Sequence, residues 1–135
     1  MAELVVLGLG SNKDFLQILD DGSEQLLKSE QILKCAVSCL EEVFVKETMK
    51  TSSIYKSSAM YYENQQDFLN MVVCGQYEKT PEELLATINK IEEQFGRDRS
   101  KEFRNGPRSL DIDIELFGNL VINTEKLEIP HKKMK

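Results

Sequence analysis

The sequence contains few of the residues that hold metals through nitrogen or sulfur. Its 135 residues include three cysteines, one histidine and no Cys-x-x-Cys pair. A structural zinc site needs four such ligands at regular spacing, so a zinc protein is disfavoured. The number of cysteines is also odd, and Cys35 and Cys39 lie one helical turn apart in an apolar stripe. We therefore expect reduced thiols in the core rather than a disulfide framework.

Long apolar segments are absent as well. No stretch approaches the roughly 20 apolar residues that a membrane span needs. The apolar start of the chain has no basic residues ahead of it, as a signal peptide would have. These absences predict a protein that stays in the cytoplasm and away from the membrane.

Positive charge is scarce overall but locally concentrated. The chain has 17 Lys and Arg against 23 Asp and Glu, a net charge of -6, which argues against a nucleic acid partner. Five basic residues nevertheless fall within twelve positions: Arg97, Arg99, Lys101, Arg104 and Arg108. Such a cluster in an acidic protein indicates a small polyanion such as a nucleotide. A solvated basic loop is the alternative that composition leaves open.

The hydrophobic pattern predicts one α+β domain over residues 1–135. The expected elements are a strand at 4–9, a helix at 23–46 capped by residues 20–23, strands at 51–57 and 67–74, a helix from Thr80-Pro81 to Gly96, a strand at 109–117 and a hairpin partner at 120–122. The order βαββαβ predicts a ferredoxin-like sandwich, in which an antiparallel sheet carries two helices on one face.

The most informative stretch is the strand that contains Asp111 and Asp113. Alternate side chains share a face in a strand, so the two carboxylates point the same way and lie about 6.6 Å apart. At an effective dielectric near 20 they repel by roughly 2.5 kcal/mol when both are ionised. Arg108 supplies one positive charge, but a pair of Mg²⁺ ions with open positions for phosphate fits better. A solvated acidic edge strand is the alternative.

Six blocks in order along the chain resemble one family, the 6-hydroxymethyl-7,8-dihydropterin pyrophosphokinases of the folate pathway. The blocks are Leu9-Gly10-Ser11-Asn12, Ser53-Ile54-Tyr55, Asp67-Phe68-Leu69-Asn70, Ile91-Glu92 with Gly96-Arg97-Asp98-Arg99, Gly106-Pro107-Arg108-Ser109-Leu110-Asp111-Ile112-Asp113, and Ile129-Pro130-His131. The resemblance implies transfer of the terminal pyrophosphoryl group of ATP to the pterin hydroxymethyl oxygen, which gives AMP and the pterin diphosphate.

The resemblance also implies a role for individual residues. Asp111 and Asp113 match the aspartates that hold two Mg²⁺ ions along the triphosphate, and with Arg97 and Arg108 they form the expected catalytic set. The expected ATP contacts are Glu92, Arg97, Arg99, Arg108, Ile114, Lys126 and His131. The expected pterin contacts are Ser57, Met60, Phe68, Asn70 and Asp111. The implied partners are ATP, the pterin and, in the same polypeptide, other domains of the folate pathway.

The sequence departs from the family pattern in places. Glu115 replaces an apolar residue beside Asp113, and whether it adds a third carboxylate to the acidic face is left open. Family members continue beyond the Pro-His block, whereas this sequence stops at Lys135, so we expect a domain without the family's C-terminal segment. The alternative function is a ferredoxin-like module that binds a nucleotide or another small molecule but is impaired in catalysis.

Overall fold

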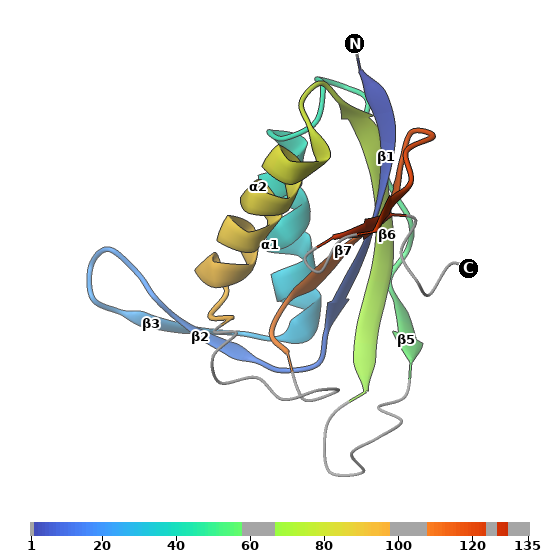
Figure 1. The fold of residues 1–135 in the computed structure, drawn as a ribbon. Coiled ribbons are helices and arrows are strands. Elements are labelled where there is room, and N and C mark those ends of the chain that lie inside the picture. The colour runs from blue at the N-terminus through green and yellow to red at the C-terminus, as the bar shows by residue number, and fades with distance from the viewer. Residues whose placement is uncertain (1, 58–66, 98–107, 124–126, 130–135) are drawn as a thin grey trace.

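The computed structural model describes residues 2–57, 67–97, 108–123 and 127–129. The elements are β1 (Glu3–Ser11), β2 (Phe15–Ile18), β3 (Glu24–Leu27), α1 (Ser29–Glu41), β4 (Lys50–Thr51), β5 (Tyr55–Ser57), β6 (Phe68–Tyr77), α2 (Pro81–Gln94), β7 (Asp111–Phe117), β8 (Ile122–Asn123) and β9 (Glu128–Ile129). Figure 1 shows α1 and α2 on the same face of the main sheet. None of the helices in these ranges is long and apolar enough to cross a membrane.

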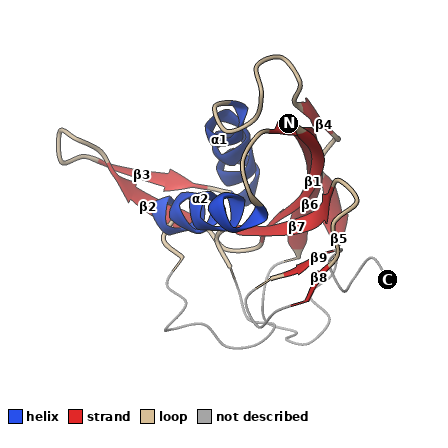
Figure 2. Cartoon of the chain, turned by 45° about the horizontal axis from the view of Figure 1, so that its top comes forward, coloured by secondary structure: helices blue, strands red, loops and turns tan. Residues whose placement is uncertain are grey.

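The main sheet has β1 at its centre. The strand order is β4-β6-β1-β7, with β5 also paired to β6, and both neighbours of β1 run antiparallel to it. This order, with both helices on one face, is the predicted ferredoxin-like α+β sandwich, so the fold prediction is confirmed. The short β8 and β9 pair with each other next to β7 and do not join the main sheet (Figure 2).

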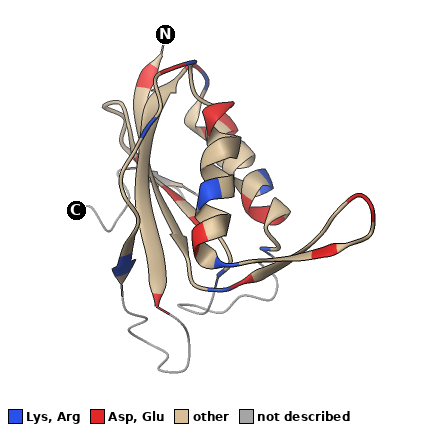
Figure 3. Ribbon diagram, turned by 180° about the vertical axis from the view of Figure 1, so that it is seen from behind, with Lys and Arg blue, Asp and Glu red and all other residues tan. Residues whose placement is uncertain are grey.

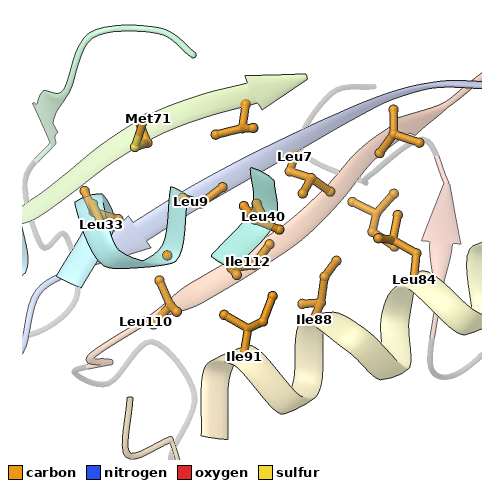
Figure 4. Close-up of a cluster of buried hydrophobic side chains, with 14 of the residues drawn as sticks. Leu7, Leu9, Leu33, Leu40, Met71, Leu84, Ile88, Ile91, Leu110 and Ile112 are labelled. Carbon is orange, nitrogen blue, oxygen red and sulfur yellow. The ribbon is translucent and has the colours of Figure 1, made fainter. Parts of the chain in front are cut away.

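The core lies between the sheet and the two helices. Leu7 and Leu9 of β1 point toward the helices together with Ile112 of β7, and all three side chains are buried. They meet Leu33 and Leu40 of α1 and Leu84, Ile88 and Ile91 of α2, as Figure 4 shows. Each such aliphatic side chain contributes about 1.5–3 kcal/mol when it leaves water. Because every second residue of β1 is used in this way, the residues between them face the opposite side of the sheet.

A β-bulge interrupts the pairing of β7 with β1. Val6 pairs with Leu116 and Leu7 pairs with Ile114, which leaves Glu115 as the extra residue. The bulge shifts the alternation of β7, so that Phe117 is 2% exposed in the core although it follows Ile114 by three positions. An added residue of this kind redirects the side chains on one part of a strand.

The predicted helix at 23–46 is wrong in its first six residues and its end. The β2–β3 hairpin occupies residues 15–27, and α1 runs only from Ser29 to Glu41. The predicted cap is instead the hairpin turn, in which Gly22 has a φ of +85° and Asp21 accepts a bond from the Ser23 amide at 2.9 Å. Aspartate and serine stabilise tight turns through the same bonds with which they cap helices, so the sequence signal was ambiguous.

The other predicted elements are confirmed with changes. The α2 helix starts as expected, where Thr80 Oγ1 accepts a hydrogen bond from the Glu83 amide at 3.1 Å, and Gly96, with a φ of +84°, follows its end. The predicted strand at 51–57 is split into β4 and β5, and the predicted hairpin partner of β7 pairs with β9 instead. The cysteines in the described ranges are free, as expected, but Cys35 is exposed rather than in the core.

Candidate active site on the outer face of the sheet

The face of the sheet opposite the helices is built around Gly10. This residue pairs with Asn70 on β6 and with Asp111 on β7, and direct cross-strand partners point to the same side of a sheet. A Cβ atom at Gly10 would lie 3.4 Å from Asn70 Oδ1 and 3.5 Å from Phe68 Cδ1. Because glycine has no side chain, it leaves a gap between two groups of residues on this face. Phe68 and Asn70 of β6 form the amide and aromatic side, and Asp111 of β7 belongs to the acidic side.

Three predicted pterin contacts lie on the amide and aromatic side. Asn70 Nδ2 donates a hydrogen bond to Ser57 Oγ at 2.8 Å, and Ser57 is the register partner of Phe68. Phe68 and Asn70 are partly buried, while Ser57 is exposed. A phenyl ring beside a fixed amide suits a flat heterocycle with polar edges. Met60, the remaining predicted contact on this side, lies outside the described residues.

Asp111, on the acidic side, is held by an arginine that follows α2. Arg97 Nη1 donates a hydrogen bond to Asp111 Oδ1 at 2.9 Å, and the Arg97 side chain is only 6% exposed. The same nitrogen forms an ion pair with Glu92. The structure therefore brings three of the predicted site residues into one network that joins α2 to β7.

Glu92 lies at the centre of this network. Its side chain is 1% exposed, and its Oε2 accepts a hydrogen bond from the Ile112 amide at 2.9 Å as well as from Arg97. The Ile112 amide lies between the two aspartates in the sequence, so Glu92 fixes the backbone that carries both. A buried charge of this kind needs such partners, because an unpaired one would cost several kcal/mol.

The start of β7 is fixed to the end of β1 by a reciprocal pair of bonds. The Arg108 amide donates to Asn12 Oδ1 at 2.8 Å, and the Asn12 amide donates to the Arg108 carbonyl at 2.9 Å. Ser109 Oγ adds a bond to the Phe95 carbonyl. The sequence patterns did not assign a role to Asn12, although it belongs to the first block of the family resemblance. In the structure it positions the strand that carries the acids.

The two aspartates share the outer face with Glu115, but the three do not form a common site. Asp111 and Asp113 are half-buried on alternate positions of β7, as predicted. The carboxylate of Glu115 lies over Gly8, where Oε1 is 2.6 Å from the place that a Cβ would take. Within the described residues, no group of three or more His, Cys, Asp or Glu could hold a metal ion. Any ion here would depend on the two aspartates and on oxygens from a ligand.

The remaining predicted residues contribute less to this geometry. The Ile114 side chain is 4% exposed and faces the core, so only its main chain is left for contact with a nucleotide. Arg99, Lys126 and His131 lie outside the described residues, and their assignment as ATP contacts stays a prediction.

Comparisons with known proteins agree with the resemblance. Residues 6–135 match the family profile described as 7,8-dihydro-6-hydroxymethylpterin-pyrophosphokinase. A 2-amino-4-hydroxy-6-hydroxymethyldihydropteridine pyrophosphokinase of Aquifex aeolicus is 40% identical over 127 residues, which are 94% of this chain and 69% of the relative. A protein of the same name from Bacillus subtilis is 42% identical over 105 residues, 78% of this chain and 62% of the relative. The mitochondrial folate synthesis bifunctional protein of Arabidopsis thaliana is 30% identical over 130 residues, which cover 96% of this chain and 21% of that protein.

Proposed function

Because this chain belongs to the 7,8-dihydro-6-hydroxymethylpterin-pyrophosphokinase family, we propose that it transfers the pyrophosphoryl group of ATP to 6-hydroxymethyl-7,8-dihydropterin. The hydroxymethyl oxygen attacks the β-phosphorus, the bond from that phosphorus to the bridging oxygen of AMP breaks, and the hydroxyl proton is released. The products are AMP and the pterin diphosphate, in a step of folate synthesis. The observation that carries the proposal is the single glycine between the amide and aromatic side and the acidic side of one sheet face.

The pterin would bind on Phe68 and Asn70. The ring would stack on the phenyl group of Phe68, because flat aromatic systems pack well on one another. Asn70 gives its Nδ2 to Ser57, which leaves its Oδ1 directed toward Gly10 as an acceptor for a donor on the pterin edge. The hydroxymethyl group would then point across Gly10 toward β7.

Asp111 and Asp113 would hold two Mg²⁺ ions together with phosphate oxygens. The donor set fits, because Mg²⁺ prefers oxygen ligands and is commonly bound by one or two carboxylates plus substrate phosphates. Bound ions of this kind neutralise phosphate charge and stabilise the charge that develops during transfer. Arg97 lies against Asp111, so its guanidinium is close to the place where the phosphates would enter.

The rest of the nucleotide would be held by residues of the arginine-rich region. Arg108 is the first residue of the described range 108–123 and is fixed through its main chain to Asn12. In the proposal, Arg108 and Arg99 engage the phosphates, while Lys126, His131 and the main chain of Ile114 contact the remainder of ATP. Glu92 acts here as the residue that orients Arg97, since its carboxylate is bound inside the protein.

The names of two relatives bear on the partners of the enzyme. Two relatives from Arabidopsis thaliana are named folate synthesis bifunctional proteins, and the match covers 21% of the mitochondrial one. We therefore include other folate-pathway domains among the partners, in the cytoplasm where ATP is available.

Nucleotide chromatography tests the reaction directly. The chain is incubated with ATP, Mg²⁺ and 6-hydroxymethyl-7,8-dihydropterin, and a control omits the pterin. We expect AMP that depends on the pterin. ADP in place of AMP would contradict pyrophosphoryl transfer, since it is the product of ordinary kinases.

A second candidate is a binding module without turnover. The residues that match the Aquifex and Bacillus relatives span 69% and 62% of the lengths of those proteins. Calorimetric binding of pterin and nucleotide without AMP formation would support this candidate over the enzyme.

A further inference from the structure

The β2–β3 hairpin, here called the arm (residues 15–27), has no part in the proposed function. It projects past α2 and away from the main sheet, as Figure 1 shows in light blue. Among the described residues, the contacts that anchor the arm lie at its base. There Phe15 packs edge-to-face on Phe95 with 6.3 Å between the ring centroids, and Leu27 is 4% exposed. The part beyond this base is a two-stranded ribbon, which by itself is marginal in water.

The apolar side chains of the arm face solvent. Leu16 pairs with Leu26 across the ribbon, and Ile18 lies on the same face as Leu16, where its partner toward the tip is Glu24. These side chains are 50%, 51% and 71% exposed, respectively. The opposite face carries the pair Gln17 and Gln25 and, at the base, the pair Phe15 and Leu27. A sheet with one wet face normally turns its polar side to water, whereas in the arm Leu16, Leu26 and Ile18 face it. No residue of the described ranges buries these three side chains.

Charge is divided along the length of the arm. Asp20, Asp21 and Glu24 lie at the tip, whereas Lys13 and Lys28 flank the base, where Lys28 pairs with Asp14 at 3.3 Å. Figure 3 shows the acidic tip at the far end of the arm and basic residues near its attachment. Strands of four residues are about 13 Å long. This exceeds the screening length of about 8 Å at physiological salt, so tip and base act as separate charges.

We propose that the arm packs, apolar face on apolar face, against the arm of a second copy that runs in the opposite direction about a twofold axis. In this arrangement each acidic tip lies beside the Lys13 and Lys28 base of the other copy. A tip-to-tip arrangement would instead bring together all the tip carboxylates of both chains. A second copy is the occupant that the arm itself specifies, because it supplies both the apolar face and the opposite charge at the matching spacing.

The predicted dimer is reversible. The arm offers three exposed apolar side chains per copy, whereas a standard stable interface uses roughly 20–30 residues and about 800 Å² a side. Dimer and monomer should therefore exchange rapidly, with a population that depends on protein concentration. This inference does not rest on the proposed function, since it uses no residue of the candidate active site.

Sedimentation velocity over a range of protein concentrations tests the apolar contact. We expect wild-type protein to shift from monomer to dimer as its concentration rises. The double variant Leu16→Ser with Ile18→Ser should weaken dimerisation by at least about tenfold, because each copy then buries less apolar surface. The matched control, Gln17→Ser with Gln25→Ser, changes the opposite face and should keep the wild-type behaviour. Circular dichroism confirms that each variant is folded.

A charge exchange tests the direction of packing. One variant reverses the tip (Asp20→Lys with Glu24→Lys) and keeps Asp21, which holds the turn, and another reverses the base (Lys13→Glu with Lys28→Glu). Each alone should dimerise more weakly than wild type, whereas a mixture of the two should form a heterodimer, because opposite charges then meet at both ends. A wild-type chain that stays monomeric at every concentration would overturn the proposal. So would a mixture that fails to restore association.

Discussion

At the scale of single residues, the acidic side of the site depends on buried charges that hold one another. Glu92 binds both the Ile112 amide and Arg97, so it should act as a positioning residue rather than as a ligand. For Glu92→Gln we expect turnover to fall by about tenfold or more, with a smaller change in the KM for ATP. The free energy of unfolding should fall by about 1–3 kcal/mol. Steady-state kinetics with a denaturant titration would measure both, and an unchanged kcat would contradict the positioning role.

Asp113 should be required for chemistry but not for folding. Its carboxylate lies on the half-buried outer face, so Asp113→Asn removes a proposed metal ligand without opening the core. Turnover should fall on the order of a thousandfold, because bound metal ions supply several kcal/mol of transition-state stabilisation. Glu115→Gln, on the same face of the same strand, is the matched control and should retain turnover. AMP formation and thermal melting measure the two effects, and normal turnover in the Asn variant would exclude the metal assignment.

Gly10 should determine the affinity for the pterin. In Gly10→Ala the new methyl group would lie 3.4 Å from Asn70 Oδ1, a close contact on the side where the pterin is proposed to bind. We expect a several-fold higher KM for the pterin and little loss of stability. Gly8→Ala, two residues earlier on the same face of β1, is the control. There the new methyl group would lie 2.6 Å from Glu115 Oε1 and would displace only the end of that side chain. Equal effects of the two substitutions on the pterin KM would show that Gly10 has no special part.

The residues of the site were predictable from sequence to different degrees. The shared face of Asp111 and Asp113 follows from strand alternation alone and is confirmed. The hydrogen bond from the Arg108 amide to Asn12 Oδ1 joins positions 96 residues apart, so no local sequence pattern could predict it. The internal role of Glu92 also could not be predicted, because on a helix it resembles any surface carboxylate until the strand amide beside it is known.

At the scale of elements, the arm shows where local patterns fail. Leu26 and Leu27 fit the helical repeat of the residues after them, but they belong to β3. The turn that decides between the two readings depends on Gly22, whose φ of +85° is costly for residues with a side chain. Helix α2 has no such ambiguity, because its cap, its N-terminal proline and its final glycine all agree.

Gly22 should therefore control the order of the arm. No atom lies within 4 Å of a Cβ at this position, so Gly22→Ala isolates the backbone effect. We expect the arm to lose about 1 kcal/mol of local stability, whereas Gly22→Asn, which tolerates positive φ, should lose less. Hydrogen exchange of the amides in residues 15–18 and 24–27 measures the loss. Exchange rates equal to wild type in the Ala variant would contradict the turn assignment.

At the scale of the whole molecule, the strand order brings distant segments to one face. The predicted topology follows from the order of strands and helices along the sequence, and the structure confirms it. Sequence order does not fix register, however, and it is register that sets Asn70, Gly10 and Asp111 in one row. That row contains segments from the start, the middle and the end of the chain, so ligands that span it should stabilise the whole fold.

The melting temperature should show that bound ligands stabilise the whole fold. A ligand that binds only the folded state raises stability with its concentration. We expect Mg²⁺ and ATP together to raise the melting temperature more than either alone, since the proposed site needs carboxylates, metal and phosphates at once. A chelator should remove the increase. The same shift with ATP and chelator present would contradict a role for the metal in nucleotide binding.

The bulge at Glu115 divides β7 into two parts with different alternation of side chains between the core and the outer face. Before the bulge, Asp111 and Asp113 point to the outer face, where the catalytic site is proposed. After it, the alternation shifts by one residue, so that Phe117 faces the core and packs on Tyr77 with 5.9 Å between the ring centroids. The bulge thus separates the outer-face positions of Asp111 and Asp113 from the core position of Phe117. A substitution on one side of the bulge leaves the facing of the residues on the other side unchanged. Deletion of Glu115 would remove the extra residue and make the pairing with β1 regular, and Ile114 and Phe117 would both still face the core opposite Leu7 and Val5. What the extra residue adds is therefore on the outer face, where it places the carboxylate of Glu115 over Gly8.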